Sequence, residues 1–128
     1  MPRPERVREF IDVVVGGEHV RAIADFYQPD ASMQENLLAP RRGRDTLIAH
    51  ESAVLGRVAA VHTHVPDVVL IDGDHVVIHW IFDFTDHKGV TRRLDELALQ
   101  RWQGDRIIEE RFVYDTATAW QVVERPGE

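Results

Sequence analysis

The sequence contains no cysteine, so disulfide bonds, thiolate metal sites and a cysteine nucleophile are all excluded. A chain without cysteine is compatible with a reducing compartment, and we expect a cytoplasmic protein. The first residues, MPRPERVREF, lack the apolar core of a secretory signal peptide. No apolar run approaches the roughly 18 residues that span a membrane. We therefore expect a soluble protein with no membrane partner.

Basic residues are scarce compared with acidic ones. The chain has 15 Lys and Arg against 22 Asp and Glu, and its formal charge is −7. Because phosphate binding needs clustered cations, nucleic acid is not an expected partner. The short basic cluster of Arg41, Arg42 and Arg44 fits a solvated turn. With 128 residues, of which 44% are hydrophobic, the chain fits a single domain over residues 1–128 with its own core.

Apolar residues recur at helical spacing in the N-terminal part of the chain. The first stripe consists of Val7, Phe10, Ile11 and Val14. Residues 20–27 repeat the spacing, and this second helix is expected to stop before Pro29. After a turn at residues 40–43, Asp45 is expected to cap a third helix that runs to about Arg57.

Alternating apolar residues and turn signals predict strands in the rest of the chain. The expected strands are 31–37, 61–71, 75–85, 92–102 and 106–115. Asp72-Gly73-Asp74 is a strong hairpin signal, and residues 86–89 and 103–105 form further turns. Helices followed by a strand meander indicate the α+β class. We expect a cone-shaped, curved and mostly antiparallel sheet wrapped over three N-terminal helices, with an internal pocket.

Three stretches carry a resemblance to a known family. They are FYQPDASMQEN at 26–36, PRRGRDTLIAH at 40–50 and WQGDRIIEERFVYD at 102–115. With this order of elements, nearly the whole chain resembles the nuclear transport factor two-like superfamily. Within it, the chain is similar to SnoaL-like polyketide cyclases, ketosteroid isomerases and limonene epoxide hydrolase. The resemblance implies the fold, but this fold hosts many unrelated reactions.

Glu35 is the first candidate for catalysis. The resemblance to ketosteroid isomerases implies a general-base carboxylate at this position, just inside the cone. Burial against apolar walls would raise its pKa toward neutrality, which suits proton transfer. The alternative is that Glu35 faces solvent at a strand edge or pairs with an arginine.

Glu51 and His50 are candidates on the third helix. On a helical wheel Glu51 lies near the middle of the apolar sector of residues 47–58. A buried unpaired charge is costly, so Glu51 is protonated, open to a watery cavity, or paired with an arginine such as Arg93 or Arg111. His50, at the edge of the sector, could orient Glu51, act as a base, or simply mark the boundary.

Asp115 is expected at the end of the last strand. The resemblance to SnoaL-like cyclases and to limonene epoxide hydrolase implies an acid or base there. The alternative is a carboxylate that caps the turn containing Thr116 and Thr118. In a regular strand Phe112 and Tyr114 lie on the face opposite Asp115 and line the pocket, although a bulge could reverse this.

Alternation divides the strand at 92–102 into two faces. The face expected to point inward comprises Leu94, Glu96, Ala98, Gln100 and Trp102. Leu97 and Leu99 then lie outward among charged residues, which suits a homodimer formed through the outer sheet face. A shift of one residue would exchange the two faces.

We expect neither a metal nor another cofactor. His62 and His64 lie on the same strand face, but two histidines need a third ligand to form a metal site. No metalloprotease, phosphate-loop or nucleophile-elbow motif occurs in the sequence.

Two specific reactions are disfavoured by the resemblance. The oxyanion donors of ketosteroid isomerases would fall at Ile11 and Ala98, which cannot donate. The arginine and one aspartate of limonene epoxide hydrolase would fall at Trp80 and Phe82.

We therefore predict a SnoaL-like enzyme, an isomerase, cyclase or related acid–base catalyst, for a small apolar carbonyl compound. Glu35 or Asp115 would move a proton, with His50 and Glu51 assisting. The substrate-binding residues would be Met33, Trp80, Phe82, Glu96, Phe112 and Tyr114. The alternative is a non-catalytic protein that binds a hydrophobic ligand or dimerises. It predicts pocket carboxylates that are all paired with arginines.

Overall fold

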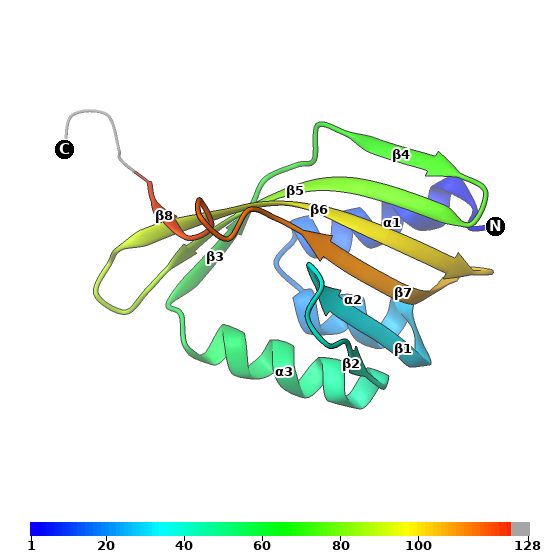
Figure 1. Cartoon of the computed structure of the whole chain (residues 1–128), viewed down its shortest axis with the longest axis horizontal. Helices are drawn as coiled ribbons and strands as arrows, with labels where there is room; N and C mark the ends of the chain where they lie inside the picture. The colour runs from blue at the N-terminus through cyan, green and yellow to red at the C-terminus, as the bar shows by residue number, and fades with distance from the viewer. Residues whose placement is uncertain (124–128) are drawn as a thin grey trace.

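The computed structural model describes residues 1–123, which form three helices and eight strands (Figure 1). The helices are α1 (Pro4–Val15), α2 (His19–Phe26) and α3 (Arg44–Gly56). The strands are β1 (Tyr27–Glu35), β2 (Arg41–Arg42), β3 (Ala60–Thr63), β4 (Val69–Asp72), β5 (His75–Thr85), β6 (Thr91–Gln103), β7 (Arg106–Val113) and β8 (Gln121–Val122). The predicted α+β class is confirmed.

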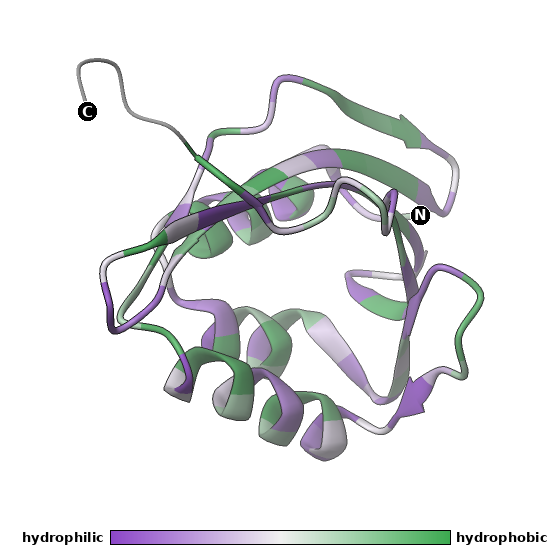
Figure 2. Cartoon of the chain, turned by 60° about the vertical axis from the view of Figure 1, so that its left-hand side comes forward, coloured by the Kyte–Doolittle hydropathy of each residue, from purple (hydrophilic) through white to green (hydrophobic). Residues whose placement is uncertain are grey.

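The strands form one curved sheet in the order β2-β1-β7-β6-β5-β3, with β4 added to β5 and β8 added to β6. All pairs are antiparallel except β1 with β7. Figure 2 shows the sheet curving over the helices, so that strands and helices surround one interior. The predicted curved, mostly antiparallel sheet over three helices is therefore confirmed.

The third helix begins differently from the prediction. Its N-cap residue is Gly43, not Asp45, and the Gly43 carbonyl accepts the first helical hydrogen bond from the Leu47 amide at 3.0 Å. Gly43 has φ of 94°, a backbone conformation that a glycine adopts without strain. Asp45 lies in the first turn instead, where a carboxylate interacts favourably with the helix dipole.

The strand predicted over 61–71 is two strands in the structure. β3 and β4 pair with successive parts of β5 and are separated by residues 64–68, which contain Pro66. Proline donates no backbone hydrogen bond, so the ladder is interrupted there. The predicted hairpin at Asp72-Gly73-Asp74 is confirmed, because Asp72 pairs with His75.

The first strand also begins earlier than predicted. β1 starts at Tyr27, directly after α2, and its pairing with β7 shifts register between Tyr27 and Ser32. Pro29 lies inside this irregular part, where the lost hydrogen bond is tolerated. The turn predicted at 40–43 contains the two-residue strand β2, and no sequence pattern indicates β8.

The inward face of β6 is the one predicted. Its alternating residues are buried: Leu94, Glu96, Ala98, Gln100 and Trp102. Leu97 and Leu99 on the opposite face are 44% and 37% exposed. No helix within residues 1–123 is long and apolar enough to cross a membrane.

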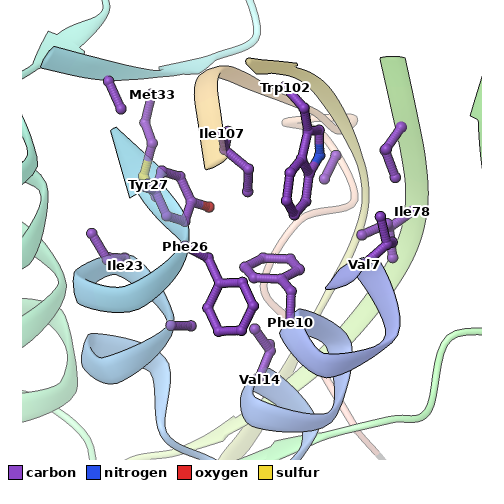
Figure 3. Packing of buried hydrophobic residues seen from close by; sticks show 14 of the residues in the cluster. Val7, Phe10, Val14, Ile23, Phe26, Tyr27, Met33, Ile78, Trp102 and Ile107 are labelled. Carbon is purple, nitrogen blue, oxygen red and sulfur yellow. The ribbon is translucent and has the colours of Figure 1, made fainter. Parts of the chain in front are cut away.

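The core lies between α1, α2 and the concave face of the sheet. Phe10 is its centre, because its ring meets those of Phe26, Tyr27 and Trp102 edge-on at centroid distances of 5.4, 6.2 and 6.1 Å (Figure 3). These aromatic contacts add to the burial energy of the rings. They fix the start of β1 against β6, which positions the pocket described below.

An ionic clamp holds the segment before β4 against the outer sheet face. His79 on β5 contacts Asp67 through Nδ1 at 2.7 Å and Asp95 on β6 through Nε2 at 2.6 Å. Carboxylate oxygens only accept, so both ring nitrogens donate and the imidazole is protonated. The hydrogen bonds from Asp95 and then Asp67 raise the pKa of His79.

The clamp predicts a dependence of stability on pH. A raised pKa in the folded state stabilises the fold fully below the unfolded pKa of 6.5, and this contribution is lost as pH rises through the folded pKa. We expect His79→Gln to be less stable than the wild type at pH 6 and nearly as stable at pH 9. Urea unfolding of both proteins at the two pH values measures this. If the stability difference between the wild type and His79→Gln grew with pH, the ionic clamp would be contradicted.

Candidate functional site

A pocket of about 170 Å³ lies between the concave face of the sheet and the helices. Its walls are largely apolar and include the aromatic residues Trp80, Phe82, Phe84, Phe112 and Trp120. Its ionisable lining residues include His19, Glu35, Arg41, His50, Glu51, Glu96 and Glu110. Four carboxyl groups in an apolar hollow are costly unless their charge is paired or removed.

Glu35 and Arg41 form an ion pair at one wall of the pocket. Glu35 ends β1, Arg41 begins β2, and the two strands pair side by side. The Arg41 Nη1 atom lies 3.6 Å from Glu35 Oε2, and both side chains are about one-third exposed. The pocket position expected for Glu35 and the arginine pairing weighed against it therefore occur together.

The α3 wall contributes Glu51 and His50. Burial raises the pKa of Glu51 above its ordinary value, Arg41 lowers it, and Glu35 raises it further. Neither arginine considered from the sequence pairs with Glu51 within residues 1–123. Arg93 binds Asp83 instead, at 2.8 Å. Burial and then Arg41 lower the pKa of His50, which favours the neutral imidazole.

Glu96 is the most deeply buried of the predicted ionisable residues. Only 6% of it is exposed, and on the β5–β6 ladder it lies directly opposite Trp80. Burial, followed by the nearby carboxyls of Glu110, Glu35 and Glu51, raises its pKa to about 9. Glu96 is therefore protonated at neutral pH, and within residues 1–123 its carboxyl has no hydrogen-bond or salt-bridge partner. A protonated carboxyl has one O–H to donate.

Glu96 also supplies a donor that the resemblance to ketosteroid isomerases did not provide. The resemblance implied these donors at Ala98 and Ile11, whose side chains cannot donate. Glu96 lies two residues before Ala98 on the same buried face of β6. The pocket therefore contains a protonated carboxyl that can donate a hydrogen bond.

Glu110 is a pocket residue that the sequence patterns did not single out. It is 2% exposed and receives hydrogen bonds from the Tyr27 hydroxyl and from Gln100 Nε2, the latter at 2.6 Å. Burial raises its pKa to about 7, although these two hydrogen bonds lower it. Glu110 lies two residues before Phe112 on β7 and therefore on the same strand face. Because Phe112 was expected to line the pocket, this spacing could have indicated Glu110 as well.

Of the expected substrate-binding residues, Met33, Trp80, Phe82, Glu96 and Phe112 line the pocket. Tyr114 does not line it. Burial and then Glu35 and Glu96 nevertheless raise the pKa of the Tyr114 phenol, so it lies close by.

Asp115 is not brought into the pocket. It is exposed, and its Oδ1 accepts a hydrogen bond from the Ala117 amide at 2.9 Å. Its backbone carbonyl accepts hydrogen bonds from the Thr118 and Ala119 amides. The pocket position expected for Asp115 is thus corrected: β7 ends at Val113, and the carboxylate caps the turn that follows.

The histidines on β3 and beside it do not assemble a metal site with other residues. In the described part of the chain, no group of three or more His, Cys, Asp and Glu side chains is arranged to hold a metal ion. His64 Nε2 contacts Asp83 Oδ2 at 2.7 Å, and Asp83 is also held by Arg93.

Sequence comparison relates the chain to a family model described as a SnoaL-like domain, which matches residues 7–110. No curated protein matches the chain.

Solved structures with similar folds include a protein from Mesorhizobium loti assigned as a SnoaL-like polyketide cyclase. It is 22% identical, with a TM-score of 0.73 over 89% of this chain and 100% of that one. A protein of ketosteroid isomerase-like fold from Catenulispora acidiphila, in complex with trimethylamine, is 19% identical. Its TM-score is 0.74 over 91% and 89% of the two chains. An epoxide hydrolase from M. tuberculosis similar to the limonene enzyme is 14% identical, with a TM-score of 0.74 over 90% and 84%. At these identities the likeness shows a common fold and not a common reaction.

Proposed function

Because the chain belongs to the SnoaL-like domain family, we propose that it is an acid–base enzyme for a small, largely apolar molecule with a carbonyl group. The reaction would be an isomerisation, a cyclisation or a related proton transfer. The observation that supports this proposal is a protonated, unpartnered Glu96 in the same apolar pocket as the ion-paired Glu35. One carboxyl is placed to donate and the other to accept.

In the proposed mechanism the Glu96 carboxyl donates a hydrogen bond to the substrate carbonyl oxygen. This interaction stabilises the negative charge that develops on the oxygen when a neighbouring carbon loses a proton. Glu35 takes that proton, and Arg41 orients its carboxylate. In an isomerase, Glu35 returns the proton to a different carbon of a conjugated dienolate. In a cyclase, the enolate carbon attacks a second carbonyl group of the substrate, and the alkoxide that forms takes the proton from Glu35. The apolar walls lower the local dielectric constant, which strengthens both interactions.

The aromatic wall would hold the apolar body of the substrate. Trp80 and Phe82 stack at a centroid distance of 5.5 Å, and Phe82 and Phe84 follow at 6.1 Å along the same face of β5. Because Trp80 lies opposite Glu96 on the ladder, a substrate lying on this wall has its polar end beside the protonated carboxyl.

Hydrogen–deuterium exchange tests the proposal even while the natural substrate is unidentified. Small cyclic and aryl ketones are incubated with the protein in heavy water, and NMR follows loss of the proton signals next to the carbonyl. We expect the wild type to accelerate exchange for ketones that fit the pocket. Asp115→Asn should exchange them at the wild-type rate, since Asp115 lies outside the pocket. Loss of exchange in Asp115→Asn would contradict this placement.

A non-catalytic ligand-binding protein is the competing function. It predicts that arginines pair with all the pocket carboxylates. Within residues 1–123, Glu51 and Glu96 have no arginine partner, which favours proton transfer. A co-purified ligand that native mass spectrometry finds unchanged after incubation, together with no ketone exchange, would support the alternative. The homodimer through the face of Leu97 and Leu99 remains a prediction that sedimentation can check.

A further inference from the structure

Glu110 is a pocket carboxyl that the proposed proton transfer does not use. It is 2% exposed, it lines the pocket, and no arginine, lysine or histidine within residues 1–123 forms an ion pair with it. A buried acid with no countercharge is expensive to keep for packing alone. Its surroundings therefore indicate what it does.

The hydrogen bonds around Glu110 have a fixed direction. Trp102 Nε1–H can only donate, and it donates to Gln100 Oε1 at 2.9 Å. The Gln100 amide group must therefore point its Nε2–H to Glu110 Oε2, at 2.6 Å. The Tyr27 hydroxyl donates to the other oxygen, Oε1. Glu110 thus receives a donor on each oxygen, which is the pattern of an ionised carboxylate.

This arrangement determines how Tyr27 can meet a ligand. Tyr27 lines the pocket, and Figure 3 shows its hydroxyl pointing away from α2 toward the strands that carry Ile107 and Trp102. While Glu110 is ionised, the Tyr27 hydrogen is committed to it, and the hydroxyl oxygen has only lone pairs to offer. Burial and Glu110 also raise the pKa of Tyr27 well above 10, so the phenol stays neutral. A ligand group that reaches the Tyr27 hydroxyl therefore meets a hydrogen-bond acceptor.

We propose that Glu110, acting through Tyr27, makes the pocket select a ligand that carries a hydroxyl group in addition to its carbonyl. The ligand hydroxyl donates to Tyr27 Oη, while the ligand carbonyl accepts from Glu96. Glu110 is a positioning residue in this scheme, and the substrate class is a small, apolar hydroxycarbonyl compound. The inference rests on the proposed function only in placing the ligand in the same pocket.

A purely structural tie between β1, β6 and β7 is the competing explanation. Such a tie needs hydrogen bonds but no charge. A glutamine at position 110 can keep both bonds, because its oxygen accepts from Gln100 and its amide donates to the Tyr27 oxygen. Glu110→Gln therefore preserves the tie but reverses the Tyr27 bond, and Tyr27 then offers a donor to the pocket.

The test compares two ligands that differ only at the hydroxyl. The probes are 4-(hydroxymethyl)acetophenone, which can donate, and 4-(methoxymethyl)acetophenone, which can only accept; neither ionises near neutral pH. Calorimetry at pH 8 gives the dissociation constant of each probe. We expect the wild type to prefer the hydroxymethyl probe, and Glu110→Gln to shift this preference by about tenfold or more toward the methyl ether. Tyr27→Phe should lose the preference as well.

A pH series separates this role from a structural one. The wild-type preference should grow as pH rises from 6 to 8 and Glu110 ionises, and it should be independent of pH in Glu110→Gln. The carboxyls that face Glu110 are Glu51 on α3 and Glu96 on β6, and Glu96 keeps its proton to about pH 9. The exposed neighbour Glu109, which pairs with Arg101, provides the matched control Glu109→Gln, expected to behave as the wild type.

Three results would overturn the inference: an equal preference in wild type and Glu110→Gln, a preference that does not change with pH, or no binding of either probe. Both probes are methyl ketones, so the exchange experiment uses the same molecules. Exchange without the expected preference would reject this inference alone. The expected preference without exchange would reject proton transfer alone.

Discussion

The Glu96→Gln variant should keep its stability between about pH 5 and pH 9, where the wild type progressively loses stability. The pKa of Glu96 is raised from 4.5 to about 9, first by burial and then by the neighbouring carboxyls. The folded state therefore holds a proton that the unfolded state releases above about pH 4.5. This contribution is complete below pH 4.5 and is lost as pH rises through 9. Per pH unit in that window, the wild type loses up to about 1.4 kcal/mol relative to the variant.

Urea unfolding from pH 5 to pH 9 measures this difference. Glutamine resembles the protonated carboxyl in shape, so the two proteins should be similar in stability at pH 5. Glu109→Gln is the matched control, because Glu109 is exposed on the same sheet and pairs with Arg101, and its curve should run parallel to the wild type. If the free energy of unfolding of Glu96→Gln ran parallel to that of the wild type from pH 5 to pH 9, Glu96 would be ionised in the folded protein.

The Glu35→Gln variant should lose most of the ketone exchange activity. If Glu35 is the base, its replacement by a neutral amide removes a contribution of about a hundredfold to ten-thousandfold. The melting temperature should change little, because the ion pair with Arg41 spans 3.6 Å between partly exposed side chains. NMR exchange rates and thermal unfolding on the same samples separate the two effects.

The two glutamates nearest Arg41 provide the deciding comparison for this prediction. Glu51 is the other carboxyl beside Arg41, and it lies on α3 instead of β1. Exchange that persists in Glu35→Gln and disappears in Glu51→Gln would transfer the role of base to α3. Full exchange activity in both variants would exclude Glu35 and Glu51 as the catalytic base.

The regular elements were predictable because their side chains repeat without interruption. Alternation along β6 placed Glu96 on the buried face, and the helical wheel of α3 placed Glu51 beside the pocket. The raised pKa of Glu96 was not predictable in full. Burial is its largest cause, but Glu110, Glu35 and Glu51 also contribute, and they reach the pocket from three other positions in the chain.

The features that the sequence did not predict lie where the backbone departs from regular helix or strand geometry. The β6–β7 pairing steps from Arg101–Glu109 to Trp102–Ile107, so Ile108 is an extra residue on β7. The bulge places both Ile107 and Glu110 inward, although strict alternation would separate them. The sequence pattern places Tyr27 at the end of a helix and Asp115 at the end of a strand. Neither the change from α2 to β1 nor the early end of β7 has a signal in alternation.

One edge of the sheet is divided between β3 and β4, and this division affects which parts of the sequence can accumulate mutations. β3 pairs with the half of β5 that carries Phe82 and Phe84, whereas β4 pairs with residues 75–78 at the other end. β3 and β4 pair with different parts of β5 and not with each other, so a change in one ladder leaves the other in place. Mutations that adapt the outer rim to new neighbours can therefore accumulate in β4 while the pocket wall of Phe82 and Phe84 stays as it is.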